Sequence, residues 1–168
     1  MEFDLSKPQC YYFNEIAKIP HGSNNEKELS DYLVAFAKSL KLNYMQDDMY
    51  NVIIYKPATA GYESASPLML QAHMDMVCEK NKDSDHDFLK DPLKLKVEDG
   101  ILRADKTTLG ADDGTGVAYM MAILADPKLP HPPLVCVFTV QEETGLYGAM
   151  NLKAKDIPAR RMVSLDGG

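Results

Sequence analysis

The sequence predicts an α/β domain: a layered mixed sheet with helices on both of its faces. Short apolar runs typical of strands alternate along the chain with segments whose apolar residues recur at helical spacing. The chain contains no internal repeat and no low-complexity tract. Its 168 residues suit one domain, and a domain of that size buries roughly 70% of the surface that its unfolded chain exposes.

The first third of the chain predicts two helices followed by two strands. A helix is expected over residues 8–19, where Pro20 ends it. After a loop, Asn24 or Asn25 is expected to cap a second helix, because apolar residues from Leu29 to Leu40 form one stripe. Strands are expected over residues 42–45 and 51–55, followed by a loop over 56–66.

The rest of the chain continues this alternation. A continuous apolar run over residues 67–72 predicts a buried strand that ends at His73. A polar stretch leads to a hairpin over 93–97 and 101–104, and a glycine-flanked segment over 109–116 opens a helix that ends before Pro127. The strongest predicted strand covers 133–140; a short helix over 145–152 and a last strand over 161–165 follow.

Three predicted strands end at residues that can bind metal. His73 follows the first, Glu142 and Glu143 follow the second, and Asp166 follows the third. In open α/β sheets, ligands bind beyond the carboxyl ends of the strands. We therefore expect these side chains to meet at one edge of the sheet.

Each of these motifs has a structural alternative when taken alone. A histidine beside an acid, as in His73-Met74-Asp75, is more often a surface or helix-end pair, but here Asp75 could hold one imidazole nitrogen while the other binds a cation. Asp112 and Asp113 could mark a helix N-terminus, or a single carboxylate there could bridge two cations.

The pair Glu142-Glu143 is equally open to two interpretations. It could be a solvated acidic turn, or one carboxylate could bind metal while the other acts as a general base, because adjacent residues in an extended segment point in different directions. Together, one histidine and several carboxylates suit Zn²⁺, Mn²⁺ or Co²⁺. Pairs of such ions activate water for amide hydrolysis.

Four sequence blocks contain these residues: LQAHMDMV at 70–77, LGADDG at 109–114, EETGLYGA at 142–149 and SLD at 164–166. In this order and spacing they resemble the aminoacyl-histidine dipeptidases (Xaa-His dipeptidase, peptidase D), which belong to the dinuclear zinc exopeptidases. The resemblance covers nearly the whole chain. It implies a zinc-exopeptidase fold of the phosphorylase/hydrolase-like kind and a centre of two divalent metal ions, with zinc expected and manganese or cobalt as alternatives.

The resemblance also implies a role for each site residue. His73 would bind one metal, Asp112 would bridge both, Glu143 would bind the other and Asp166 would complete the first. Asp75 would orient His73, and Glu142 would be the general base.

Members of this family are much longer than 168 residues. They carry a lid or dimerisation domain after the position of Asp166 and then the remainder of the catalytic domain. The resemblance therefore implies that residues 1–168 are the N-terminal part of the catalytic domain. It also implies that a final histidine ligand beside Glu143 is missing, and we expect little or no dipeptidase activity from these residues alone.

Composition narrows the remaining possibilities. A formal net charge of −7 argues against nucleic acid as a partner, and no apolar run approaches the ~20 residues of a membrane span. Three cysteines without a CxxC pair, and an N-terminus without signal-peptide character, favour the cytoplasm. The expected partner is a small dipeptide substrate, with a homodimer or edge-strand association as a further possibility.

Two other functions remain open at this point. The chain could be a metal-binding or interaction module without catalysis, or an α/β domain whose strand-end acids are coincidental. His21, His86 and His131 are expected to be structural or solvated, because they lie in loop-like segments.

Overall fold

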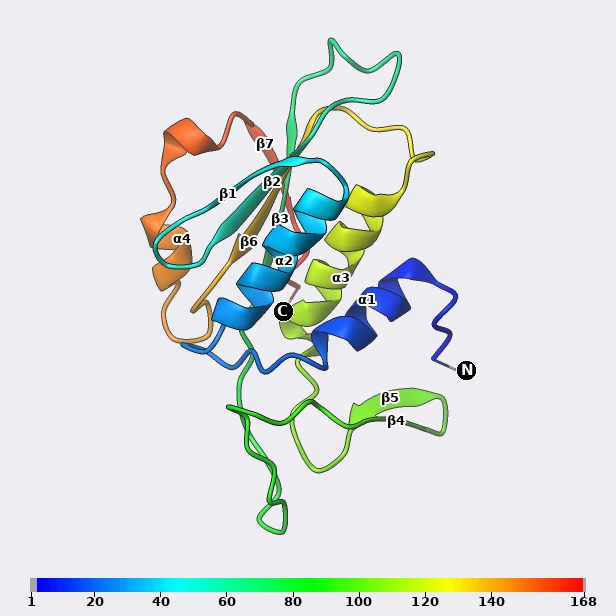
Figure 1. The fold of residues 1–168 in the computed structure, drawn as a ribbon, viewed down its shortest axis with the longest axis vertical. Helices are drawn as coiled ribbons and strands as arrows, with labels where there is room; N and C mark the ends of the chain where they lie inside the picture. Colours follow the sequence, from blue (N-terminus) through cyan, green and yellow to red (C-terminus); the bar gives the residue numbers. More distant parts are fainter. Residues whose placement is uncertain (1–2, 168) are drawn as a thin grey trace.

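The computed structural model describes residues 3–167, which form a five-stranded mixed sheet, a separate hairpin and four α-helices (Figure 1). The elements in chain order are α1 (Pro8–Ile16), α2 (Lys27–Ser39), β1 (Asn43–Gln46), β2 (Val52–Lys56), β3 (Leu68–His73), β4 (Leu95–Glu98), β5 (Ile101–Ala104), α3 (Ala111–Ala125), β6 (Leu134–Thr139), α4 (Tyr147–Asn151), the 3-10 turn η1 (Ala154–Asp156) and β7 (Arg161–Ser164).

The sheet has the order β1-β2-β6-β3-β7, with β6 at its centre. All six residues of β6 are buried, whereas in β3, for which the sequence predicts a buried strand, only Leu70, Ala72 and His73 are buried. Strand β3 runs parallel to β6 and β7, whereas β2 is antiparallel to β6 and β1 to β2. The carboxyl ends of β3, β6 and β7 therefore lie at one edge of the sheet, towards the lower end of Figure 1.

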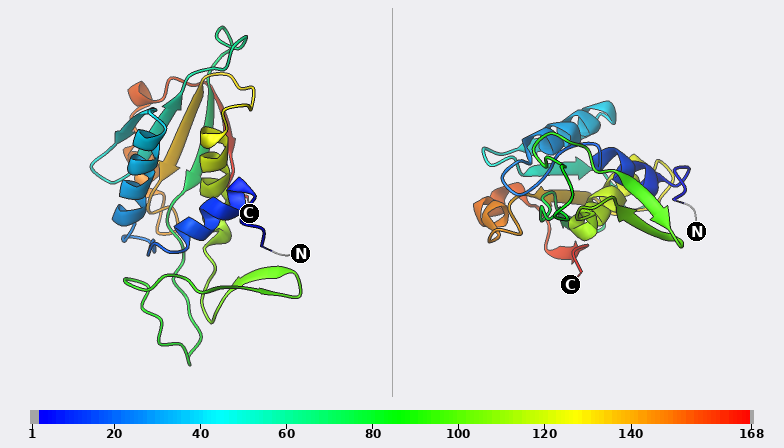
Figure 2. Two further views of the ribbon diagram at one scale, coloured as in Figure 1. Left: turned by 45° about the vertical axis from the view of Figure 1, so that its right-hand side comes forward. Right: turned by 90° about the horizontal axis from the view of Figure 1, so that it is seen from below.

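The two faces of the sheet are covered unequally. Helices α1, α2 and α3 pack on one face around a large core that includes Phe138, Met120 and Leu33. On the other face, Ile53, Val135 and Val137 form a small cluster that is covered by the segment after α4, including Leu152 and Ile157. Figure 2 shows α2 and α3 side by side over the first face. Helical segments thus lie on both faces, but most of the burial is on one.

Two regions lie outside this layered core. The hairpin β4–β5 forms its own two-stranded sheet beyond the carboxyl ends of the strands (Figure 1). Strand β7 is an edge of the main sheet, and its four residues are exposed. Within residues 3–167, no helix is both long and apolar enough to cross a bilayer.

Every helix and strand that the sequence predicts is present, with shifts of a few residues at the ends. Helix α1 ends at Ile16, about one turn before the predicted end, with Ala17 at its C-cap. The prediction that Asn24 or Asn25 caps α2 is wrong, because the residue at the N-cap is Glu26. The Glu26 carboxylate turns away from the helix and accepts hydrogen bonds from the backbone of Asn24 and Gln141.

Candidate metal centre

His73 is the last residue of β3 and is almost wholly buried. Its backbone remains in the sheet, paired with Thr139 of β6. Its Nδ1 lies 2.9 Å from the backbone oxygen of Asp75 and 3.4 Å from Asp75 Oδ1. Because Nδ1 faces these acceptors, Nε2 is the nitrogen that points towards the other acids, at 2.9 Å from Asp112 Oδ1.

The carboxylate of Asp75 is fully buried and accepts several hydrogen bonds. Oδ1 accepts the backbone N–H of Glu142 at 2.9 Å, and Oδ2 accepts that of Glu143 at 3.2 Å and the hydroxyl of Ser23 at 2.8 Å. Asp75 therefore joins the end of β3 to the acidic segment after β6.

Asp112 and Asp113 lie where α3 begins, but neither has helical backbone angles. This local departure from the helix sends the two side chains in different directions. Asp113 is buried and accepts the backbone N–H groups of His73 at 3.3 Å and Gly116 at 3.0 Å. Asp112 faces His73, and its side chain is 69% exposed.

The structure brings together three of the four predicted metal ligands. One ligand atom each from His73, Asp112 and Glu143 lies within 4.8 Å of the others. Asp166 is exposed and does not belong to this group. Together with Glu142, Gln71 and Thr139, it lines a neighbouring cavity of about 250 Å³ on the β7 side.

Charges in this group shift the pKa values of its members. Burial alone would lower the pKa of His73, but the hydrogen bonds to Asp75 and Asp112 and the charges of Asp75 and Asp113 outweigh it and raise that pKa to about 9. Burial raises the pKa of Asp113 to about 6. Burial and the neighbouring Asp112 raise the pKa of Glu143.

The donor set fits a divalent cation. It contains one imidazole nitrogen whose opposite nitrogen is held by an acceptor, together with two exposed carboxylates that lie close to each other. A cation would relieve the repulsion that raises the pKa of Glu143.

Three residues that support this site are not predicted from the sequence. Asp113 is expected only as part of the Asp112-Asp113 pair, and the pairing of two acids is the signal for both. Ser23 and Glu26 lie in a polar loop without a distinguishing pattern, and their contacts are with residues more than 50 positions away.

His21, His86 and His131 are all buried, and within the described residues their Nε2 atoms have no hydrogen-bond partner.

Residues 69–164 match the profile of Peptidase family M20/M25/M40. The chain belongs to this family. The match includes His73 at the end of β3, Asp112 at the start of α3 and Glu143 after β6, the three residues that cluster in this M20/M25/M40 chain.

Similar proteins agree with this assignment. The chain is 42% identical over 160 residues to the cytosol non-specific dipeptidase of Escherichia coli K12, covering 95% of this chain and 33% of that protein. The structure of aminoacylhistidine dipeptidase from Vibrio alginolyticus superimposes with a TM-score of 0.93 at 39% identity, covering 95% of this chain and 33% of that one. A tripeptidase from Staphylococcus aureus gives a TM-score of 0.79 at 26% identity, covering 96% and 43%. The chain thus spans about a third of the length of the two dipeptidases.

Proposed function

We propose that this chain contributes most of a two-metal centre that hydrolyses dipeptides, with Xaa-His dipeptides as the substrate class. The observation that carries the proposal is the convergence of His73, Asp112 and Glu143 at the carboxyl ends of the strands. The family membership and the similarity to proteins described as dipeptidases support peptide hydrolysis.

In this proposal His73, Asp112, Glu143 and Asp166 hold the ions, with Asp112 between the two. Zn²⁺ is the proposed metal, and Mn²⁺ or Co²⁺ would suit the same nitrogen and oxygen donors. The bound ions would polarise the scissile carbonyl and lower the pKa of water. His73 Nε2, which lies 2.9 Å from Asp112 Oδ1, would have to be deprotonated to act as a ligand.

The remaining roles belong to Glu142 and Asp75. Glu142 would accept a proton from the attacking water and return it to the amine nitrogen as the C–N bond breaks. Asp75 would fix the tautomer and orientation of His73 and hold the backbone of both glutamates.

Three free cysteines and the similarity to a cytosolic dipeptidase support a cytoplasmic setting. A homodimer or association through the β7 edge stays a prediction.

The test compares metal content and hydrolysis in the complete protein and its His73→Ala variant. Elemental analysis should find two metal ions in the wild type and fewer in the variant. The metal affinity of the variant should be lower by more than about 100-fold, which exceeds the loss typical of residues that only hydrogen-bond to a metal ligand. Cleavage of an Xaa-His dipeptide should fall in parallel. His86→Ala is the matched control, because His86 is also buried but packs against Phe88 in a peripheral loop.

Unchanged metal content in His73→Ala and Asp112→Ala would support a purely structural domain. Bound metal without hydrolysis of any dipeptide would support a metal-binding module. Either result contradicts the proposed function.

A further inference from the structure

The acidic segment after β6 is held by its backbone. Three consecutive N–H groups, those of Gln141, Glu142 and Glu143, all donate to buried carboxylates. Asp75 accepts the second and third, and Glu26 Oε1 accepts the first at 3.0 Å. Two acids from distant parts of the chain therefore fix the direction in which Glu142 and Glu143 leave the sheet.

Glu26 is a buried carboxylate that accepts hydrogen bonds from backbone N–H groups. Only 3% of the residue is exposed, and burying a carboxylate is costly unless hydrogen bonds satisfy it. The same Oε1 also accepts the backbone N–H of Asn24, which closes the loop before α2. No lysine or arginine contacts Glu26 among the described ion pairs. Its partners are backbone amides.

Gln141 is the residue that needs such a support. Its φ of 52° lies in the left-handed region, which non-glycine residues seldom adopt. At this turn the chain leaves β6 and presents Glu142 and Glu143 in succession. An acceptor on the Gln141 N–H stabilises this conformation against the extended alternative, which would rotate both glutamates.

The loop that carries Glu26 is itself tied to the other side of the site. Ser23 donates its hydroxyl to Asp75 Oδ2 and its backbone N–H to the carbonyl of Met76 at 3.3 Å. Met76 donates in turn to the carbonyl of His21 at 3.2 Å. Glu26 thus reaches Gln141 from a loop that is anchored to the segment after His73.

We propose that Glu26 is a positioning residue, which holds the N–H of Gln141 so that Glu142 and Glu143 face the metal centre. This inference rests on the proposed function for its catalytic consequence, but its structural content can be measured without metal. The side chain acts as a hydrogen-bond acceptor, and its length places the acceptor oxygen at the Gln141 N–H. Its charge is not required, in keeping with the way burial raises the pKa of Glu26.

Two substitutions in the complete protein separate the effect of side-chain length from the effect of charge. Glu26→Gln keeps the length and an acceptor oxygen but removes the charge, whereas Glu26→Asp keeps the charge but shortens the side chain. We expect Glu26→Asp to lower both metal affinity and kcat by about 10- to 100-fold, as loss of a residue that supports a metal ligand typically does. KM should stay within about threefold of the wild-type value. Glu26→Gln should stay within about threefold of the wild type in all three quantities.

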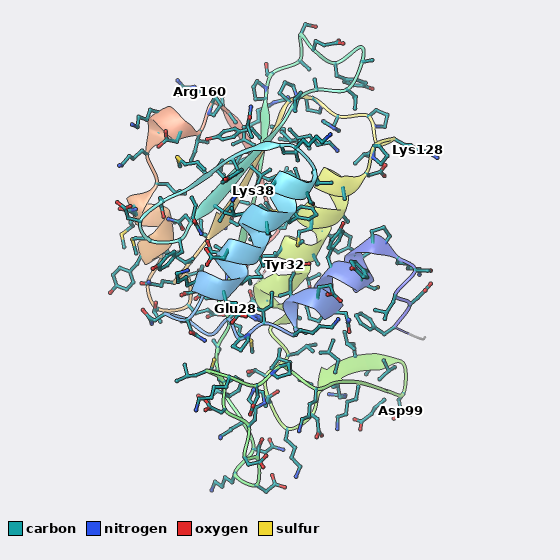
Figure 3. All side chains as sticks on the ribbon, in the orientation of Figure 1. Glu28, Tyr32, Lys38, Asp99, Lys128 and Arg160 are labelled. Carbon is teal, nitrogen blue, oxygen red and sulfur yellow. The ribbon has the colours of Figure 1, made fainter. Side chains whose placement is uncertain are left out.

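A second readout does not depend on metal or activity. In the metal-free protein, hydrogen exchange at the amides of residues 141–143 should be at least about tenfold faster in Glu26→Asp and unchanged in Glu26→Gln. Glu28→Ala is the matched control, because Glu28 is exposed at the start of α2, where Figure 3 labels it. It should change none of these measurements.

The outcomes distinguish the two proposals. Faster exchange in Glu26→Asp alone, in a protein that binds no metal, would support the positioning role and reject the proposed function. Normal exchange and normal kcat in Glu26→Asp would overturn the positioning role and leave the metal centre intact. An impaired Glu26→Gln beside a normal Glu26→Asp would also overturn it, because charge would then be the requirement.

Discussion

The two sides of the candidate centre differ in how the protein holds them. On the β3 side, the side chains of His73 and Asp75 are 1% and 0% exposed, and each hydrogen-bonds to backbone groups. On the other side, Asp112 at the start of α3 is 69% exposed, and Glu143 in the segment after β6 is also exposed. The first side is built into the folded core. The second is placed by the backbone but is open to solvent and to a ligand.

Because of this difference, we expect one side to contribute to the free energy of folding and the other to the free energy of ion binding. A buried carboxylate that accepts several N–H bonds stabilises the fold, and its removal leaves those donors unsatisfied. Exposed carboxylates that face each other add little to stability in the absence of a cation and repel each other. The buried side should therefore control folding and geometry, whereas the exposed side should control ion binding.

Asp75→Asn should give the largest loss of stability. The asparagine amide keeps one acceptor oxygen and replaces the other by NH2, so it would present N–H donors to the N–H group of either Glu142 or Glu143, both of which now donate to Asp75. Breaking a buried charged network in this way costs about 3 kcal/mol or more, and the free energy of unfolding from urea denaturation of the metal-free protein measures it. Ser23→Ala removes one donor to the same carboxylate and should cost less, about 1 kcal/mol. Equal losses in both variants would contradict the central role of Asp75.

Asp112→Asn should have the opposite profile. Its exposed carboxylate contributes little to folding, so the free energy of unfolding without metal should change by less than about 0.5 kcal/mol. Metal affinity, measured by chelator competition, should fall by more than about 100-fold, beyond the loss expected for a supporting residue. A large loss of stability without metal would show that the exposed side is also part of the folding core.

The sequence predicts the elements of this fold well, because each has a local signal. The apolar run over residues 133–140 predicts strand β6, and the stripe from Leu29 predicts α2. The placement of His73 at the end of β3 follows from the same kind of signal. The meeting of His73 and Glu143 follows from one rule, that parallel strands end at the same edge of a sheet. The rule does not account for Asp112, which lies at the start of α3, and it also predicts Asp166, which lies outside the group.

Long-range partners of buried polar groups are where the sequence fails. Asn24 or Asn25 is the expected cap of α2, yet Glu26 takes that position and turns towards Gln141, 115 residues away. Asp112 and Asp113 point in different directions because the backbone is not helical at either residue. Neither event has a local pattern, because each depends on which segments the finished sheet brings together.

Glu26→Gln should produce the smallest effect, and one that depends on pH. Burial raises the pKa of Glu26 above its ordinary value of 4.5, and the negative charge of Asp75 adds to this, although the backbone N–H groups of Asn24 and Gln141 oppose it. As the pH rises past 4.5, the unfolded chain releases this proton before the folded protein does, so wild-type stability falls until the folded pKa is passed. Glutamine has no such proton. Urea denaturation of both proteins between about pH 4 and pH 8 should therefore show the stability of Glu26→Gln rising relative to the wild type with pH and then levelling off. Glu28→Gln controls for the loss of one charge at an exposed site on the same helix. A relative stability that falls with pH would mean that Glu26 is held as a stabilising charge, and would place it with Asp75 among the ionised anchors of the buried side.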